Sequence, residues 1–343
     1  MTENYPMRPQ GSFLKDSSGA VAPITIILLV AFFALLAIVV DLGHLMLVRN
    51  QLQNAADAGA LAGADALINS TTTPAWAAAQ TAAIAAVQSN KADTQALLTA
   101  NVQTGYWDTT WTPTTTPANL LSTGIVPDAT QFPAVKVSVQ KNAGSNNGPV
   151  SLTFGQIFGI TTVNVAAHAT AIVGNPSTVP AGDLFPLAIS SAMLSTINYT
   201  APGPSNPVYI GSSYHYPSDQ AGQWTSFGTD ANDVPTIENL MATGNPSPVS
   251  VNDDIWIEPG TKTVLFADAA AYVGKTVLLA VVNGDMTTHA FNPIVGFIPF
   301  IITAAEGGSG KYVEGYFIGA IIAPGSIGGG PNFGAYTPPY LVQ

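Results

Sequence analysis

The strongest hydrophobic pattern in the chain is an unbroken apolar run near its N-terminus. Residues 20–40 (AVAPITIILLVAFFALLAIVV) contain no charged residue and no histidine over 21 positions. At about 1.5 Å per residue, a helix of that length spans the ~30 Å hydrocarbon layer of a bilayer. Pro23 falls near the start of the run, where a missing N–H does little harm. We therefore predict a transmembrane helix over residues 20–40.

Two other interpretations of this run fit less well. A buried core helix rarely extends so far without a polar face. A cleaved signal peptide usually has an apolar region of about 7–15 residues, followed by small residues at a cleavage site. Here the run continues through Asp41 and Gly43 into LMLVRNQLQ without a clear A-x-A site. The pattern favours an uncleaved signal anchor.

The basic residues around the run indicate its orientation. Arg8 and Lys15 precede it, and only Arg49 follows closely. The positive-inside rule then places the N-terminus in the cytoplasm. We expect a single-pass protein of the cytoplasmic membrane, with residues 1–19 as a cytoplasmic tail and the bulk of the chain periplasmic or extracellular.

A helical pattern continues beyond the run over residues 41–68. Small residues recur there at helical spacing, which lets another backbone approach closely. They pack either against the protein's own sheet or against a helix of a second copy, which would be helix-mediated self-association. The candidate membrane and assembly positions of this helix are Asp41, Gly43, Arg49, Gln53, Asn54, Asp57, Gly59 and Gly63.

The charged residues of this helix fall into two groups. Asp41 stands where the apolar run meets water and marks that boundary. Arg49, Asp57 and Asp65 recur at spacings of eight, near one helical face. They either pair with each other or a partner, or form a solvated stripe.

The remaining pattern predicts two further regions. After a second Ala-rich helix at 74–89, a weaker helix follows Lys91, and residues 173–183 (VGNPSTVPAGD) form a turn-rich domain boundary. Strands are predicted at 101–108, 134–141 and 161–173, with a short helix at 151–160. An all-β domain then covers 184–343 and ends in a Gly- and Pro-rich tail. Its predicted strands are 185–190, 253–259, 261–267, 275–282, 294–305 and 311–322, with one helix at 236–243.

Composition excludes several classes of function. The net charge is −11 and only nine residues are Lys or Arg, which argues against nucleic-acid binding. The chain has no cysteine, so disulfides, thiolate metal sites and cysteine nucleophiles are absent. Hydrophobic residues make up 47% of the chain, enough apolar surface to offset the entropy of folding.

The sequence contains no recognisable motif of catalytic or metal-binding residues. The four histidines lie far apart without HxH or HExxH spacing, although His44 lies one turn from Asp41 and is close enough to pair with it. The acidic cluster Asn252, Asp253, Asp254 and Glu258 offers oxygen ligands for calcium but lacks an EF-hand pattern, and a turn entering a strand is the more ordinary interpretation. We expect no catalytic residue, cofactor or metal.

Residues 19–67 resemble the N-terminal signature of the TadE/TadG-like proteins of bacterial Flp (Tad) pilus assembly. The matching features are a glycine before the helix, the VDLG exit at 40–43, the basic Arg49 and the stretch LQNAADAGALAGA at 52–64. A weaker similarity continues through the predicted strands to about residue 174. Ile24 stands where prepilin-type cleavage sites carry glutamate, and the DxSxS metal motif of some relatives does not occur.

The resemblance implies an α+β fold in which a pilin-like region over 41–173 follows the membrane helix. It also implies a non-enzymatic scaffold or accessory protein of pilus assembly, whose partners are the lipid bilayer and other pilus-assembly proteins or pilins. Two alternatives stay open. The chain is a pilin-like structural subunit of a surface filament, or it is an extracellular binding, adhesion or hydrolytic protein.

Overall fold

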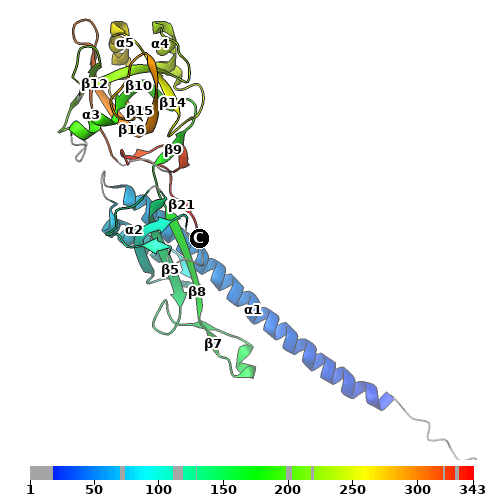
Figure 1. The fold of residues 1–343 in the computed structure, drawn as a ribbon. Helices are drawn as coiled ribbons and strands as arrows, with labels where there is room; N and C mark the ends of the chain where they lie inside the picture. Colours follow the sequence, from blue (N-terminus) through cyan, green and yellow to red (C-terminus); the bar gives the residue numbers. More distant parts are fainter. Residues whose placement is uncertain are drawn as a thin grey trace, which may run out of the picture.

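The computed structural model describes residues 18–69, 74–110, 119–128, 130–197, 203–217, 220–319, 321–328 and 332–343. It shows the α+β chain that the sequence predicts, in which one long apolar N-terminal helix precedes a mostly β region with some further helices (Figure 1). The predicted cytoplasmic tail, residues 1–19, lies outside the described residues except for its last two positions, which begin the helix.

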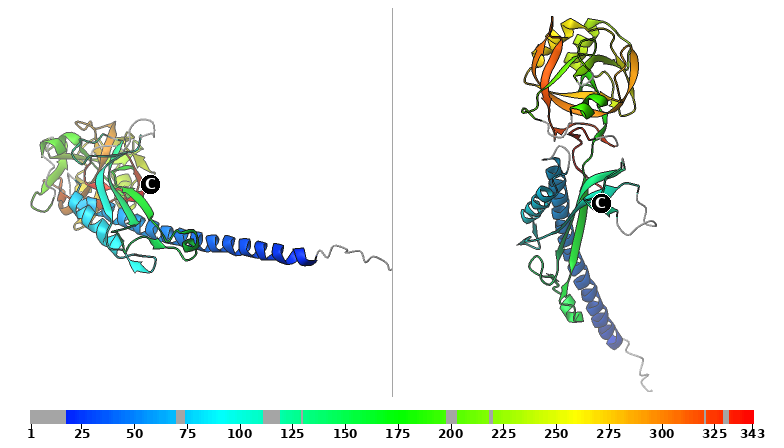
Figure 2. Two further views of the ribbon diagram at one scale, coloured as in Figure 1. Left: turned by 90° about the horizontal axis from the view of Figure 1, so that it is seen from below. Right: turned by 60° about the vertical axis from the view of Figure 1, so that its left-hand side comes forward.

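Helix α1 (Ser18–Ala66) is 49 residues long and passes without a break from the predicted span into the first folded region. It begins two residues before that span, so Pro23 stands in its second turn. Its N-terminal half projects away from the rest of the protein, whereas its C-terminal half lies against a sheet (Figure 2). The helix ends in the 3-10 turn η1 (Leu67–Asn69).

A five-stranded antiparallel sheet in the order β21-β8-β5-β3-β4 packs on the C-terminal half of α1. Helix α2 (Trp76–Gln88) lies beside α1 and joins the same core. Alternate side chains of the central strand, Val135, Val137 and Val139, are fully buried in that core, as the period of two in a strand dictates. The strands are β3 (Asn101–Asp108), β4 (Leu120–Leu121), β5 (Gln131–Lys141), β8 (Val165–Ile172) and β21 (Tyr340–Leu341).

A second sheet, formed by the C-terminal region, closes on itself as a barrel. Its order is β10-β15-β16-β14-β12-β11-β17, and the additional pairings β10–β12 and β16–β17 complete the ring (Figure 2). Trp224, Phe266 and Phe300 are fully buried in the core of this region. The strands are β10 (Leu184–Ser190), β11 (Val208–Ser212), β12 (Ala221–Phe227), β14 (Asp254–Ile257), β15 (Thr276–Val282), β16 (Ala290–Glu306) and β17 (Tyr312–Phe317).

Two secondary-structure predictions are wrong. The helix expected after Lys91 is a hairpin of β1 (Lys91–Ala92) and β2 (Gln95–Ala96), whose turn residues Asp93 and Thr94 have φ of 54° and 63°. Positive φ at both central residues gives the turn that matches strand twist. The strand expected at 261–267 is helix α5 (Thr263–Asp268), continued by η3 (Ala269–Tyr272), because the alanines that follow favour a helix.

The C-terminal region also holds more helix than its sequence pattern indicates. Helix α4 (Val234–Thr243) confirms the one expected there, and Asp233 caps it by accepting a hydrogen bond from the Thr236 N–H at 2.9 Å. Helix α3 (Ser191–Thr196) was not expected. The region is therefore a barrel with helices rather than an all-β unit.

The turn-rich stretch 173–183 contains strand β9 (Pro176–Val179), which pairs with β13 (Val249–Ser250) and β19 (Ser326–Ile327). The Gly- and Pro-rich tail likewise forms short strands, among them β18 (Ile321–Ile322) and β20 (Ala335–Tyr336), which pair in parallel. The division of the chain into domains at 173–183 stays a prediction.

The end of the chain returns to the first sheet. Strand β21 pairs with β8, and the backbones of Thr170 and Val342 are joined by a 2.8 Å hydrogen bond. The side chain of Val342 packs on a small cluster that contains Trp107 and Phe132. The sequence-based division, which gave all of 184–343 to one β-rich domain, missed this pairing.

Deleting residues 338–343 is expected to lower the stability of the first sheet by about 1–2 kcal/mol, through lost hydrogen bonds and apolar contacts. Hydrogen exchange should show faster exchange at Thr170 and along β8. Amides of the barrel serve as the internal control, because β21 pairs with no barrel strand. Equal exchange at Thr170 in both chains would contradict the pairing.

Candidate membrane and assembly helix

The two halves of α1 have opposite surroundings. In the N-terminal half, the large apolar side chains from Val21 to Val40 are between 43% and 67% exposed. In the C-terminal half, Val48, Leu52 and Ala56 are fully buried under the sheet and α2. Among the described residues, α1 is the one helix long and apolar enough to cross a membrane. The fully buried apolar side chains begin at Val48, about two turns after the apolar run of the sequence ends.

Asp41 lies at this transition and binds a distant segment. It is 6% exposed, and its carboxylate accepts backbone N–H groups from Thr153 (2.9 Å), Phe154 (3.0 Å) and Gly155 (2.7 Å). Burial acts to raise the pKa of Asp41, but the three N–H donors, with His44 nearby, outweigh it and hold that pKa below its ordinary value. Asp41 therefore does more than mark a water boundary, because it fixes a loop to the helix.

His44 does not pair with Asp41, so that prediction is wrong. Its Nε2 lies 3.0 Å from Oδ1 of Asp93, in the β1–β2 turn. The side chain of Gln51 accepts the N–H of the same Asp93 at 2.8 Å. His44 and Gln51, about two helical turns apart on α1, therefore both bind the turn of the β1–β2 hairpin. Gly43 has no atom within 4 Å of the place where a Cβ would stand, so no close packing explains a glycine there.

Gly59 and Gly63 lie where the helix meets α2 and β5. A Cβ on Gly59 would come within 2.7 Å of Val87 Cγ2, and one on Gly63 within 2.8 Å of Val135 Cγ1. Real Cβ atoms do not approach so closely, so both positions require glycine. The row of small residues is thus occupied by the protein's own elements, and it presents no free face for a helix of a second copy.

Some polar residues in the C-terminal half of α1 form hydrogen bonds within the protein, and others are exposed to solvent. Gln53 Nε2 donates to Asp57 Oδ1 at 2.7 Å and to the carbonyl of His168 at 3.0 Å, which links α1 to β8. Arg49 and Asn54 are exposed. Within the described ranges, Arg49 forms no ion pair with Asp57 or Asp65. Arg49 thus belongs to a solvated face.

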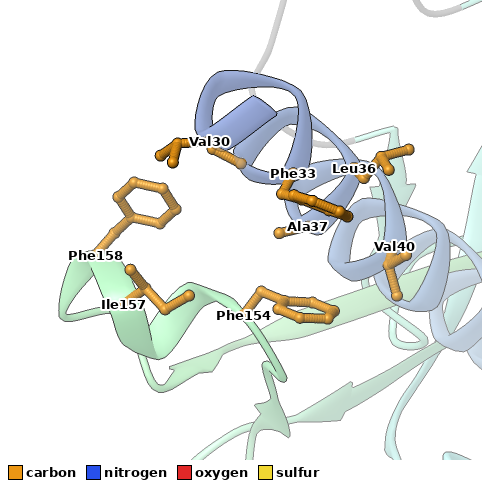
Figure 3. A pocket seen from close by; sticks show the side chains of 9 residues that line it. Val30, Phe33, Leu36, Ala37, Val40, Phe154, Ile157 and Phe158 are labelled. Atoms are coloured by element: carbon orange, nitrogen blue, oxygen red, sulfur yellow. The ribbon is translucent and has the colours of Figure 1, made fainter. Parts of the chain in front are cut away.

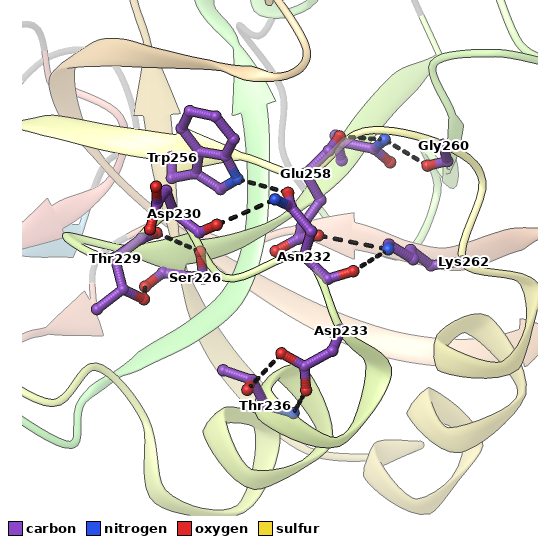
Figure 4. A network of polar contacts seen from close by, with 11 residues as sticks. Ser226, Thr229, Asp230, Asn232, Asp233, Thr236, Trp256, Glu258, Gly260 and Lys262 are labelled. Carbon is purple, nitrogen blue, oxygen red and sulfur yellow. Dashed lines mark hydrogen bonds and ion pairs between the residues drawn. The ribbon is translucent and has the colours of Figure 1, made fainter.

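A buried carboxylate in the barrel is the chemical feature that sequence reasoning missed. Glu258 is fully buried, and neither of its carboxylate oxygens has a hydrogen-bond donor among the described residues (Figure 4). The nearest cation is Lys262, whose Nζ lies 3.7 Å from Oε2. Burial raises the pKa of Glu258 to about 7, although Lys262 opposes the rise and Asp233 adds to it.

The surroundings of Glu258 are a structural network. Asn232 accepts a hydrogen bond from Trp256 Nε1 at 2.9 Å, and its carbonyl accepts one from Lys262. Gln223 Nε2 donates to the carbonyls of Glu258 and Gly260, each at 2.8 Å. In the described ranges no three His, Asp or Glu side chains are grouped to hold a metal ion. Glu258 is the last residue of the acidic cluster that offers oxygen ligands in the sequence, and it is buried in the barrel.

Comparison with known proteins finds two family models that match the first half of the chain. The family model for TadE/G-like Flp pilus-assembly proteins matches residues 19–66, which is nearly the whole of α1. The model for Tad-like Flp pilus-assembly proteins matches residues 62–171, a range that contains α2, β3, β4, β5 and nearly all of β8. No curated protein and no solved structure matches the chain significantly. Through residues 19–171, the chain is therefore similar to Flp pilus-assembly proteins of the TadE/G-like and Tad-like kinds.

Proposed function

We propose that this chain is a membrane-anchored, non-enzymatic scaffold or accessory component of Flp pilus assembly. The observation that carries the proposal is the exposed apolar surface of α1 over residues 21–40, beside a C-terminal half with one face buried under the sheet and α2. Such a surface is unfavourable in water and suits lipid. Its helical backbone satisfies its own hydrogen bonds, as a membrane-crossing segment must.

In this proposal the anchor fixes the position of the folded part. The sheet and α2 pack on the C-terminal half of α1, so the first folded region stays next to the lipid. The N-terminus lies in the cytoplasm, and the folded part lies on the far side, where it contacts other pilus-assembly proteins or pilins. Only 8% of the residues are charged, so the contacts of the chain depend more on shape and hydrogen bonding than on charge.

Replacing both Leu28 and Leu29 with arginine is expected to remove the full chain from the membrane. A charged residue at the centre of a span costs about 2.5–3.5 kcal/mol on insertion, so two cost roughly 5–7 kcal/mol. The wild-type chain should stay in the membrane pellet at alkaline pH and dissolve only in detergent. The double variant should be lost from the pellet and should fail to restore pili in a deletion strain.

The matched control replaces both Met46 and Leu47 with arginine. These residues are about as exposed as Leu28 and Leu29 on the same helix, but they lie outside the predicted span. This variant should stay in the membrane. Release of the wild-type chain at alkaline pH would exclude anchoring, and normal piliation after deletion of the chain would exclude the role in assembly.

A pilin-like filament subunit is the second candidate. Its support is the architecture of α1, which is half covered by an antiparallel sheet and half bare, because bare helical halves from several copies can pack together as a filament core. Shearing the cells separates the two candidates. An assembly component stays with the membranes, whereas a filament subunit appears in the sheared material.

A further inference from the structure

A hairpin loop between β5 and β8 lies beside the predicted membrane span. It consists of β6 (Val150–Ser151), the 3-10 turn η2 (Gly155–Phe158) and β7 (Thr162–Val163). An open apolar groove of about 520 Å³ separates it from α1. In Figure 3, Phe158 lies opposite Val30 and Phe154 lies near Val40. The hairpin therefore runs along α1 over about ten residues, or ~15 Å of helix.

The tip of the hairpin is apolar and exposed. Ile157 is 76% exposed, Phe158 is 56% exposed and Ile160 is 53% exposed. No charged residue and no histidine occurs between Asn142 and Ala167. Outside α1, the other exposed large apolar side chains of the described residues are scattered along the chain. Such a cluster marks an interaction surface, and its lack of charge suits hydrocarbon.

Seven backbone N–H groups between Leu152 and Ile160 donate to acceptors within the protein, which favours entry into lipid because unpaired backbone groups are costly there. The N–H groups of Leu152, Ile157, Gly159 and Ile160 donate to backbone carbonyls inside the hairpin at 2.9–3.0 Å. Three more donate to Asp41, as described above.

We propose that the hairpin over residues 152–160 is a second membrane-embedded element, inserted beside α1 in the leaflet next to the folded part, with lipid acyl chains filling the groove. This inference rests on the anchoring of α1 proposed above. Lipid is the occupant because the groove has α1 residues 30–40 as its other wall. Whatever surrounds those residues in the membrane also reaches Phe158 and Ile157. Asp41 fixes the depth of the hairpin relative to the helix.

Single-cysteine variants test this directly, because the chain has no cysteine of its own. The full chain is reconstituted in phosphatidylcholine vesicles with cysteine at Ile157, at Val126 or at Leu29. Val126 is the matched control, an exposed aliphatic residue in the loop before β5. The rate of reaction with a charged, membrane-impermeant maleimide is measured. The thiolate is the reactive form, so Ile157→Cys should react roughly tenfold or more slowly than Val126→Cys.

Each other outcome separates the two proposals. If Ile157→Cys reacts as fast as Val126→Cys while Leu29→Cys is protected, the hairpin is outside the lipid and the anchor stands. If Leu29→Cys also reacts fast, the anchor itself fails. If the protection of Ile157→Cys disappears when the vesicles are diluted to one protein each, a second copy rather than lipid covers the hairpin, and the inference is overturned. All three positions are more than half exposed, so cysteine there leaves the core unchanged.

Discussion

Gly63→Leu is expected to lower the free energy of unfolding of the first folded region by about 3 kcal/mol, at the upper end of overpacking effects. A Cβ at this position would lie 2.8 Å from Val135 Cγ1 and 3.1 Å from the carbonyl oxygen of Ala79. The carbonyl belongs to helix α2 and cannot rotate away, so α1 and α2 must separate. Denaturation of the full chain in mild detergent measures the change, with hydrogen exchange of β5 as the local readout.

Gly43→Leu is the control for this variant. It makes the same substitution on the same helix, but nothing lies within 4 Å of its Cβ. Because leucine favours a helix more than glycine does, the stability should stay the same or rise slightly. Equal destabilisation by the two variants would show that helix propensity, and not the contact with α2 and β5, decides the effect.

The same two glycines show what one sequence can predict. The period of the small residues identifies a face on which another backbone comes close, and the structure confirms the close approach at Gly59 and Gly63. The period says nothing about which backbone that is. An unpaired helix of a second copy and the protein's own α2 require the same row of small side chains.

Contacts between distant segments are the main part that the sequence does not predict. The carboxylate of Asp41 binds backbone groups more than 110 residues away, and β21 crosses from the barrel region back to β8. Backbone N–H groups carry no side-chain signal, and a strand of two residues has too short a pattern to detect. Local signals did better, since α1, α2 and α4 were expected close to their observed bounds.

Glu258 illustrates a different limit, because burial of one carboxylate depends on the closure of the barrel around it. In sequence, alternation in the strand before it indicates only a turn leading into an extended segment. The structure adds that the side chain points inward, beside Lys262 and without a hydrogen-bond donor. A paired surface glutamate and a nearly unpaired buried one have the same local sequence.

The stability of the barrel is expected to fall with rising pH through the titration of Glu258. Its pKa is about 7 in the folded chain, against 4.5 as the ordinary value. Between these values the folded state binds more protons than the unfolded state, so the free energy of unfolding decreases as the pH rises. The stabilisation is complete below pH 4.5 and lost above pH 7, a change on the order of 3 kcal/mol over the whole range. Denaturation at pH 5, 6, 7 and 8 measures it.

Glu258→Gln isolates this contribution, because glutamine keeps the shape but carries no charge at any of these pH values. The stability difference between the variant and the wild type should move in favour of the variant by about 2 kcal/mol from pH 5 to pH 8. Asp254→Asn, which removes an exposed carboxylate from the adjacent strand β14, should leave the slope unchanged. A Glu258→Gln curve parallel to the wild type would mean that Lys262 already compensates the buried charge, and the network around Asn232 would then be an ion-pair site rather than a site of unpaired charge.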